Sequence, residues 1–260
     1  MLVYPQFHNG CLAQFPLERR RSLRSAIARA MGGAYFARYD QDAGTVVWTL
    51  LYQELSTNEM QVLRDFFEAT EGRLHSFVFV DPMANLLKWS GDLTHSVWET
   101  TLATVGETDE PDPFEQHNAF RVVNPSGGTQ GLAQTIGAPG EYEYVFSTWL
   151  RGEAGSTVRI TIADSENVIA MNGRWSRHHL CAIPGTEAGV RFAIEAPPGG
   201  EFLVFGPQVE AQRGASAYKK TGGAAAIYTK ARFDMDELEC QFDGPSRYTT
   251  EVRIRSKEQG

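Results

Sequence analysis

Residues 45–82 read TVVWTLLYQELSTNEMQVLRDFFEATEGRLHSFVFVDP. The β-branched and aromatic run Thr45–Tyr52 favours a strand. Residues 56–59 (STNE) form a capping box, in which the serine side chain caps the amide of the glutamate and the glutamate reaches back. Apolar residues at helical spacing follow over residues 60–67, and Ser76–Val80 reads as a second strand that stops at a proline turn. This stretch therefore predicts a strand, a capped amphipathic helix and another strand.

The residues before this stretch allow two structures. Leu23, Ile27 and Met31 would share one face of a helix that ends at a glycine. Alternatively, Gly32-Gly33 is the tight turn of a β-hairpin. The alternating aromatics of residues 34–39 favour the hairpin, because its second strand would lead directly into the strand that begins at residue 45.

After residue 84 the sequence changes to short aromatic runs separated by Gly, Pro and Asn turns. Strands are predicted at Ala119–Asn124, Tyr142–Arg151, Val158–Ala163, Arg174–Leu180, Val190–Ala196 and Phe202–Phe205. Strands at this spacing, without helices between them, indicate a β-sandwich or jelly roll of about eight strands.

The C-terminal segment has two more strand patterns, Ile227–Phe233 and Glu251–Arg255. They are too few to form a domain, because an isolated hairpin is marginally stable in water. We therefore expect residues 224–260 to complete the sheet begun by residues 1–84, with a sandwich of residues 85–223 inserted at an exposed loop. The predicted fold class is mainly β: an α+β base domain with one clear helix, interrupted by a β-sandwich.

Charge and cysteine content exclude several function classes. The net charge of −8 argues against non-specific nucleic-acid binding, although residues 1–40 carry +4 through an arginine-rich segment at 19–29. The three cysteines are far apart and lack a CxxC pair, so neither a disulfide framework nor a zinc site is expected. No signal peptide and no apolar run of about 18 residues is present, so we expect no membrane insertion.

The sequence predicts no catalytic, cofactor-binding or metal-binding residue. Glycoside hydrolysis needs two carboxylates that face each other, but the acidic residues gather in Glu107–Asp112, which reads as a solvated loop. This loop lacks the spacing of an EF-hand. His178 and His179 would point to opposite faces of a strand and could not chelate a metal together.

Three tryptophans, Trp98, Trp149 and Trp175, could stack on sugar rings. Large aromatic side chains dominate sandwich cores, so core packing is the favoured interpretation for all three. Gln208 and Glu210 stand near a strand end, and we expect them to hydrogen-bond neighbouring loops rather than a ligand. Glycan-binding residues stay unassigned.

The first part of the chain resembles a known family. The pattern comprises Trp48, Tyr52, Leu55-Ser56, the capped helix with Phe66-Phe67, Gly72-Arg73, Phe77, Phe79 and Asp81-Pro82. It is similar to the N-terminal part of phage minor tail proteins of the distal-tail type and of gene-transfer-agent tail proteins. The resemblance covers residues 12–84 and 225–255, and it implies a small β-rich domain that forms a ring between the tail tube and the tail tip.

The insert resembles the carbohydrate-binding-like jelly rolls of phage virion proteins and polysaccharide-degrading enzymes. The matching pieces are Asn85-Leu86-Leu87, Ser90 and Asp92, Trp98, Ser147, Trp149 and Arg151, Trp175-Ser176-Arg177, Phe205–Glu210, Ala215–Tyr218 and Thr221. The resemblance implies the fold more firmly than an activity, because one fold hosts many functions.

We therefore expect a structural virion protein and not an enzyme. It would be a distal-tail or baseplate ring subunit in the virion tail, assembled in the host cytoplasm. Its partners would be copies of itself in a hexameric ring, the tail tube protein and the tail hub or tip proteins. The basic segment 19–29 and the acidic segment 54–71 are candidates for subunit pairing.

The sandwich would face outward in such a ring, with cell-surface polysaccharide as its candidate partner. Several copies in one ring would strengthen a weak single site through avidity. The alternative is a soluble carbohydrate-binding module or an accessory domain of a glycan-degrading system, which predicts a monomer with measurable sugar affinity.

Overall fold

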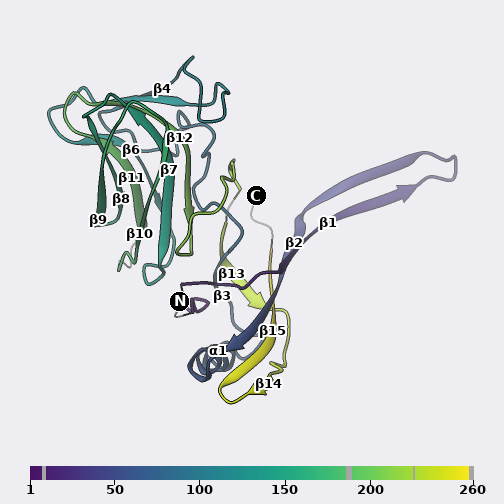
Figure 1. The fold of residues 1–260 in the computed structure, drawn as a ribbon. Coiled ribbons are helices and arrows are strands. Elements are labelled where there is room, and N and C mark those ends of the chain that lie inside the picture. Colours follow the sequence, from purple (N-terminus) through teal and green to yellow (C-terminus); the bar gives the residue numbers. More distant parts are fainter. Residues whose placement is uncertain (8–9, 186–188, 225, 258–260) are drawn as a thin grey trace. The chain divides into compact units, whose positions relative to one another are not determined.

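The computed structural model describes residues 1–7, 10–185, 189–224 and 226–257. Two compact units make up the chain (Figure 1). We call the first the base, which consists of Met1–Val80 and Ile227–Gly260, and the second the sandwich, Asp81–Ala226. The described residues are mainly β, with one helix, which confirms the predicted fold class.

The base is built on one antiparallel sheet in the order β1-β2-β15-β13-β3, with β14 paired to β15. Its elements are β1 (Leu17–Arg29), β2 (Tyr35–Leu55), α1 (Thr57–Ala69), β3 (Phe77–Val80), β13 (Ile227–Phe233), β14 (Gln241–Gly244) and β15 (Arg247–Lys257). Strand β15, from the end of the chain, pairs along β2 from its beginning. Segments distant in sequence thus share one sheet and one core.

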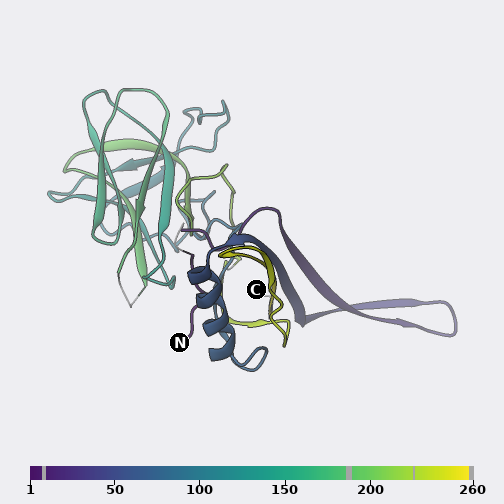
Figure 2. The ribbon, with the colours of Figure 1, turned by 60° about the horizontal axis from the view of Figure 1, so that its bottom comes forward.

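Helix α1 confirms the predicted capping box. The Ser56 hydroxyl accepts the Glu59 amide at 3.3 Å, and the Glu59 carboxylate accepts the Ser56 amide at 3.0 Å. The helix lies against one face of the curved sheet (Figure 2). Phe66 and Phe67 contact Phe233 of β13 there, with ring centroids 5.9 and 5.0 Å apart. The cap fixes where the helix begins, and the aromatic contacts hold it on the sheet.

Replacing Ser56 with alanine is expected to lower the free energy of unfolding of the base by about 1 kcal/mol, because the Glu59 amide loses its acceptor and the Glu59 carboxylate loses the hydroxyl that helps to hold it. Hydrogen exchange read by mass spectrometry on base peptides measures the loss. Thr57→Ala is the matched control, since this exposed neighbour has no part in the cap. Equal protection in the two variants would contradict the role given to the cap.

The predicted hairpin at Gly32-Gly33 is confirmed, since β1 and β2 pair from Leu17↔Leu50 to Arg29↔Tyr35. The two strands predicted at residues 34–39 and 45–52 are one continuous strand, β2. From Thr45 onward β2 also pairs with β15, whereas residues 35–44 of β2 have only β1 beside them in the described structure. We call residues 23–44 the hairpin arm. It extends beyond the sheet of the base (Figure 1).

The sandwich consists of two antiparallel sheets, in the orders β10-β7-β12-β5-β4 and β6-β11-β8-β9. Its strands are β4 (Thr104–Glu107), β5 (Phe120–Val123), β6 (Gln130–Ile136), β7 (Tyr144–Gly152), β8 (Thr157–Ile162), β9 (Ser165–Ala170), β10 (Ser176–Ala182), β11 (Val190–Ala196) and β12 (Glu201–Glu210). Tyr144 and Phe146 of β7 meet Phe192 of β11 between the sheets, with ring centroids 5.9 and 5.8 Å apart. This aromatic layer is the core of the sandwich.

The chain enters and leaves the sandwich at neighbouring points. The Asp81 amide donates a hydrogen bond to the Ala226 carbonyl at 2.9 Å. The expected insert comprised residues 85–223, and the compact unit runs from Asp81 to Ala226. Along the described residues, no helix combines the length and the apolar character that a membrane crossing needs.

Candidate functional site

Strand β7 presents two different faces because side chains alternate along a strand. Tyr144, Phe146 and Leu150 are fully buried and face the core, so Trp149 and Arg151 lie on the outer face of the five-stranded sheet. Both are half-buried. The core packing predicted for Trp149 is therefore wrong, because the residue has the opposite parity to its apolar neighbours.

The register of the sheet places Trp149 in the middle of a row of three strands. Arg177 of β10 is its partner on one side and Phe205 of β12 on the other. Phe114 and Tyr218, from neighbouring loops, bring their rings to 5.7 and 6.3 Å from Trp149. Each also contacts Phe205, at 5.8 and 5.3 Å. We call Phe114, Trp149, Phe205, Tyr218 and Arg177 the aromatic face.

A glycine permits this close packing. Gly206 lies within a register shift of β12, between Phe205 and Gln208, and adopts φ +60°, a conformation that L side chains rarely adopt. A Cβ at this position would meet the Tyr218 ring at 3.2 Å and the Trp149 ring at 3.3 Å. The bulge therefore lets Tyr218 pack directly onto the sheet.

Arg177 is the cationic member of the aromatic face. Its guanidinium carbon lies 4.3 Å from the centroid of the Trp149 ring, and Nη2 donates to the Ser147 hydroxyl at 3.0 Å. No carboxylate pairs with Arg177 among the residues that the structure describes. Burial lowers the pKa of this guanidinium, and the charge of Glu210 partly opposes the shift. A half-buried cation stacked on an aromatic ring can donate hydrogen bonds to a ligand.

A second arginine–tryptophan pair lies beside the aromatic face. Arg151 stacks 5.9 Å from the Trp175 centroid and forms a 2.8 Å ion pair with Glu110. The Trp175 indole donates to the Pro111 carbonyl at 2.9 Å, so the half-buried ring packs against a loop. The predicted core position of Trp175 is thus wrong. For Trp98 it is confirmed, since that side chain is buried.

The acidic loop is more ordered than its composition suggested. Asp112 is buried and accepts the amides of Phe114 at 2.7 Å and Gln116 at 3.1 Å. Its carboxylate thereby fixes the turn that carries Phe114 onto the sheet. The predicted solvated loop is wrong at this residue, because turn amides replace water around the carboxylate. Within the described residues, no group of three or more His, Cys, Asp or Glu side chains is placed to hold a metal ion.

Gln208 and Glu210 are fully buried in β12 and bind the following loop, as predicted. Glu210 accepts the Ser216 amide at 2.9 Å and the Lys219 ammonium at 2.8 Å, and Gln208 accepts the Lys219 amide at 2.7 Å. Burial alone would raise the pKa of the Glu210 carboxyl, but these hydrogen bonds outweigh it and hold the pKa below its usual value. The network fixes the segment that carries Tyr218.

The two adjacent histidines lie on opposite faces of β10, which confirms the prediction. His178 forms a 2.8 Å hydrogen bond with the Ser176 hydroxyl. His179 pairs in register with Ser147, on the outer face and next to the aromatic face. Burial lowers the pKa of His178, and the charge of His179 lowers it further.

Sequence reasoning missed the grouping of Phe114, Phe205, Tyr218 and Arg177. One available signal was the parity of strand β7, which separates Trp149 from Phe146 and Leu150. The contributions of the two loops carry no local signal, because Phe114 and Tyr218 reach Trp149 and Phe205 only through the tertiary fold.

Neither a protein-family model nor a curated protein matches this sequence. Among solved structures, the chain is similar to TmCBM61 in complex with β-1,4-galactotriose, with 15% identity and a TM-score of 0.36 over 48% of this chain and 97% of that chain. It is similar to the CBM22-1 xylan-binding domain of Paenibacillus barcinonensis Xyn10C, with 11% identity and a TM-score of 0.41 over 52% of this chain and 100% of that one.

A third similar structure is the enzymatically active domain of tailspike protein 4 of bacteriophage CBA120. The identity is 16% and the TM-score 0.38, over 50% of this chain and 22% of that chain. At these sequence identities and TM-scores, the similarity to the three structures concerns the fold alone.

Proposed function

We propose that the sandwich binds a saccharide on the outer face of its five-stranded sheet. The aromatic face is the observation that carries this proposal. A pyranose ring offers apolar C–H groups to an aromatic ring and hydroxyl groups to a planar donor, and Phe114 and Arg177, which both contact Trp149, supply the two. Binding sites commonly combine aromatic walls with a few placed polar groups.

The carboxylates near this face support binding rather than turnover. Glu110 is held by Arg151 at 2.8 Å, and Asp112 is buried under the amides of its own turn. Hydrolysis of a glycosidic bond needs one carboxyl group as acid and a second as base or nucleophile across the bond. Both carboxylates instead hold the loop that presents Phe114.

Phe114→Ala is expected to weaken saccharide binding about tenfold, because an aromatic contact contributes roughly 1 kcal/mol or more beyond the area that it buries. The full chain is first screened on an array of bacterial surface polysaccharides and of neutral and uronate-containing oligosaccharides. The strongest soluble hit is then titrated by calorimetry.

The matched control is Val168→Ala. Val168 is as exposed as Phe114, at 58%, but lies on β9 of the other sheet. Its removal should leave the affinity unchanged. The absence of any hit on the array, or equal affinities of the two variants, would refute binding at the aromatic face.

We propose as a second function that the base assembles with copies of itself, as a distal-tail ring subunit between a tail tube and a tail tip. The hairpin arm favours this function. Its Leu23, Ile27, Tyr35 and Phe36 side chains are all more than half exposed. Such a ribbon is marginally stable in water by itself, so a neighbouring subunit would supply the missing contacts.

The assembly role predicts a defined oligomer. Light scattering on the full chain at several concentrations, followed by negative-stain microscopy, should show closed rings. Genes for a tail tube, a tape measure and a hub beside the gene of this protein would give independent support. A monomer at every concentration would refute this second function and leave saccharide binding untouched.

A further inference from the structure

The hairpin arm carries apolar groups on both of its faces. Cross-strand partners lie on the same side of a ribbon, so Ile27 and Tyr35 share one face and Phe36 lies on the other. At the tip, Met31 is fully exposed. A patch of this kind, on both sides of a thin ribbon, indicates a surface that another chain encloses.

The charged residues in the outer part of the arm are all positive. Residues 25–38 include Arg29 and Arg38 and no acidic residue. Arg29 is on the face of Tyr35, and Arg38 on the face of Phe36. Both arginines are exposed and have no ion-pair partner within the described part of the chain. This outer part of the arm therefore favours an acidic partner surface, and the same part of a second arm would repel it.

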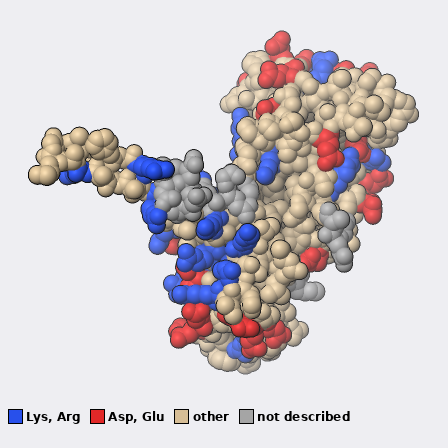
Figure 3. Space-filling view, turned by 180° about the vertical axis from the view of Figure 1, so that it is seen from behind, with Lys and Arg blue, Asp and Glu red and all other residues tan. Residues whose placement is uncertain are grey.

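The base offers two grooves of opposite character. One groove, of 640 Å³, is lined by Lys230, Arg232, Arg255 and Lys257. Figure 3 shows that Lys and Arg side chains gather along the base. This groove would repel the arm.

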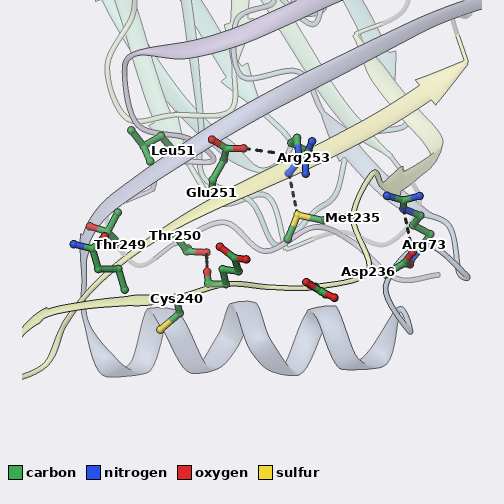
Figure 4. Close-up of a pocket in the computed structure, with 12 residues that line it drawn as sticks. Leu51, Arg73, Met235, Asp236, Cys240, Thr249, Thr250, Glu251 and Arg253 are labelled. Carbon is green, nitrogen blue, oxygen red and sulfur yellow. Dashed lines mark hydrogen bonds and ion pairs between the residues drawn. The ribbon is translucent and has the colours of Figure 1, made fainter.

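The other groove, of 620 Å³, lies between β15 and the connection from β13 to β14 (Figure 4). We call it the acidic groove. Its two arginines are already paired, Arg73 with Asp236 at 3.4 Å and Arg253 with Glu251 at 3.8 Å. The remaining charges decide which partner it attracts.

Glu237 and Glu239 are these remaining charges. Both line the acidic groove, both are exposed, and neither has an ion-pair partner among the described residues. Leu51 and Cys240 add half-buried apolar surface beside them. The groove thus combines two unpaired negative charges with a small apolar surface, which complements the cationic and apolar outer part of the arm.

We propose that the hairpin arm of one copy docks in the acidic groove of a second copy, so that the part of the arm that carries Arg29 and Arg38 lies beside Glu237 and Glu239. The pairing of β2 with β15 ends at Thr45, and from there the arm extends away from the part of the sheet that forms its own groove (Figure 1). This docking rests on the proposed assembly of the base. It is a head-to-tail contact, which closes into a ring when the rotation per subunit permits.

Burial of the arm's apolar side chains provides the affinity of the docking, and the complementary charges determine which surface the arm binds. Exposed ion pairs contribute little to stability by themselves, but complementary charges speed encounter and exclude wrong surfaces. Assembly should therefore weaken as the salt concentration rises, without being abolished.

A cross-link tests the docking directly, because Cys240 already lies in the acidic groove. Met31→Cys is introduced at the arm tip, in a Cys181→Ser background that removes an exposed thiol. A short bismaleimide is added to the full chain, and the linked peptides are identified by mass spectrometry. Links between positions 31 and 240 of different chains are expected, and the same variant without Met31→Cys should lack them.

Charge reversal provides the second test. Glu237→Lys with Glu239→Lys should abolish the 31–240 link, and so should Arg29→Glu with Arg38→Glu. A mixture of the two reversed chains should recover the link, because each then offers the charge that the other needs.

The alternatives give separate results. Links between position 31 of two chains would mean that arms pair with each other, which overturns the docking but leaves the assembly role intact. Links to Cys11 would overturn it in the same way. An unlinked monomer would refute both the docking and the assembly.

Discussion

Phe233→Ala is expected to lower the free energy of unfolding of the base by about 3–5 kcal/mol, because a fully buried ring leaves a cavity that the core cannot close. Phe233 meets Phe67, Phe77 and Phe66 at 5.0, 5.1 and 5.9 Å, so its loss weakens the packing of α1 on the sheet. Exchange of base amides, followed by mass spectrometry across a denaturant series, measures the change.

Phe242→Ala is the control for this substitution. The Phe242 ring is 69% exposed and contacts only Tyr248 among the rings of the described residues. Its removal should cost less than about 1 kcal/mol. If both variants lost the same stability, the aromatic cluster would not be the core of the base.

Glu210→Gln is expected to destabilise the sandwich by about 2–4 kcal/mol. The carboxylate accepts hydrogen bonds from the Ser216 amide and the Lys219 ammonium, and a neutral amide cannot replace both acceptors. The segment that carries Tyr218 should loosen with it, so saccharide affinity should fall in the same variant. Exchange of sandwich amides reports the stability.

The effect of this substitution depends on pH in a definite direction. The pKa of Glu210 is lower in the folded protein than in the unfolded chain, so the unfolded state binds more protons as the pH falls. The stabilisation is complete above the unfolded pKa of about 4.3 and disappears as the pH falls through the folded value. The difference between wild type and Glu210→Gln should therefore shrink below about pH 4.

Glu201→Gln serves as the comparison. Glu201 pairs with Arg121 at 2.7 Å, but its side chain is 48% exposed. An exposed pair contributes about 0–1 kcal/mol, so this variant should follow the wild type across the whole pH range. A pH profile of Glu210→Gln parallel to that of the wild type would contradict the stabilised carboxylate.

Local sequence patterns were sufficient to predict the helix, the turn and the strands whose formation depends on residues close together in the sequence. The capping box located α1, and Gly32-Gly33 located the hairpin turn. The six strands predicted in the insert are present: Val190–Ala196 coincides with β11, and the ends of the other five are shifted by a few residues. The missed strands β4, β6 and β9 are short or contain many polar and small residues, so no run of large apolar groups marks them.

The candidate site was less predictable, because it depends on which face of a strand each side chain occupies and on the positions of two loops. One position along β7 decides whether Trp149 faces the core or the solvent, and composition does not show which. Phe114 reaches the sheet only because Asp112 is buried beneath the turn, and Tyr218 only because Glu210 and Gln208 fix its loop. The hydrogen bonds that hold the two loops are local, but the ring contacts of Phe114 and Tyr218 with Trp149 join residues that are distant in sequence.

The 2.9 Å backbone hydrogen bond between Asp81 and Ala226 has an evolutionary consequence. Since both junctions of the sandwich lie side by side, recombination can exchange this unit for another domain without altering the path of the flanking strands of the base.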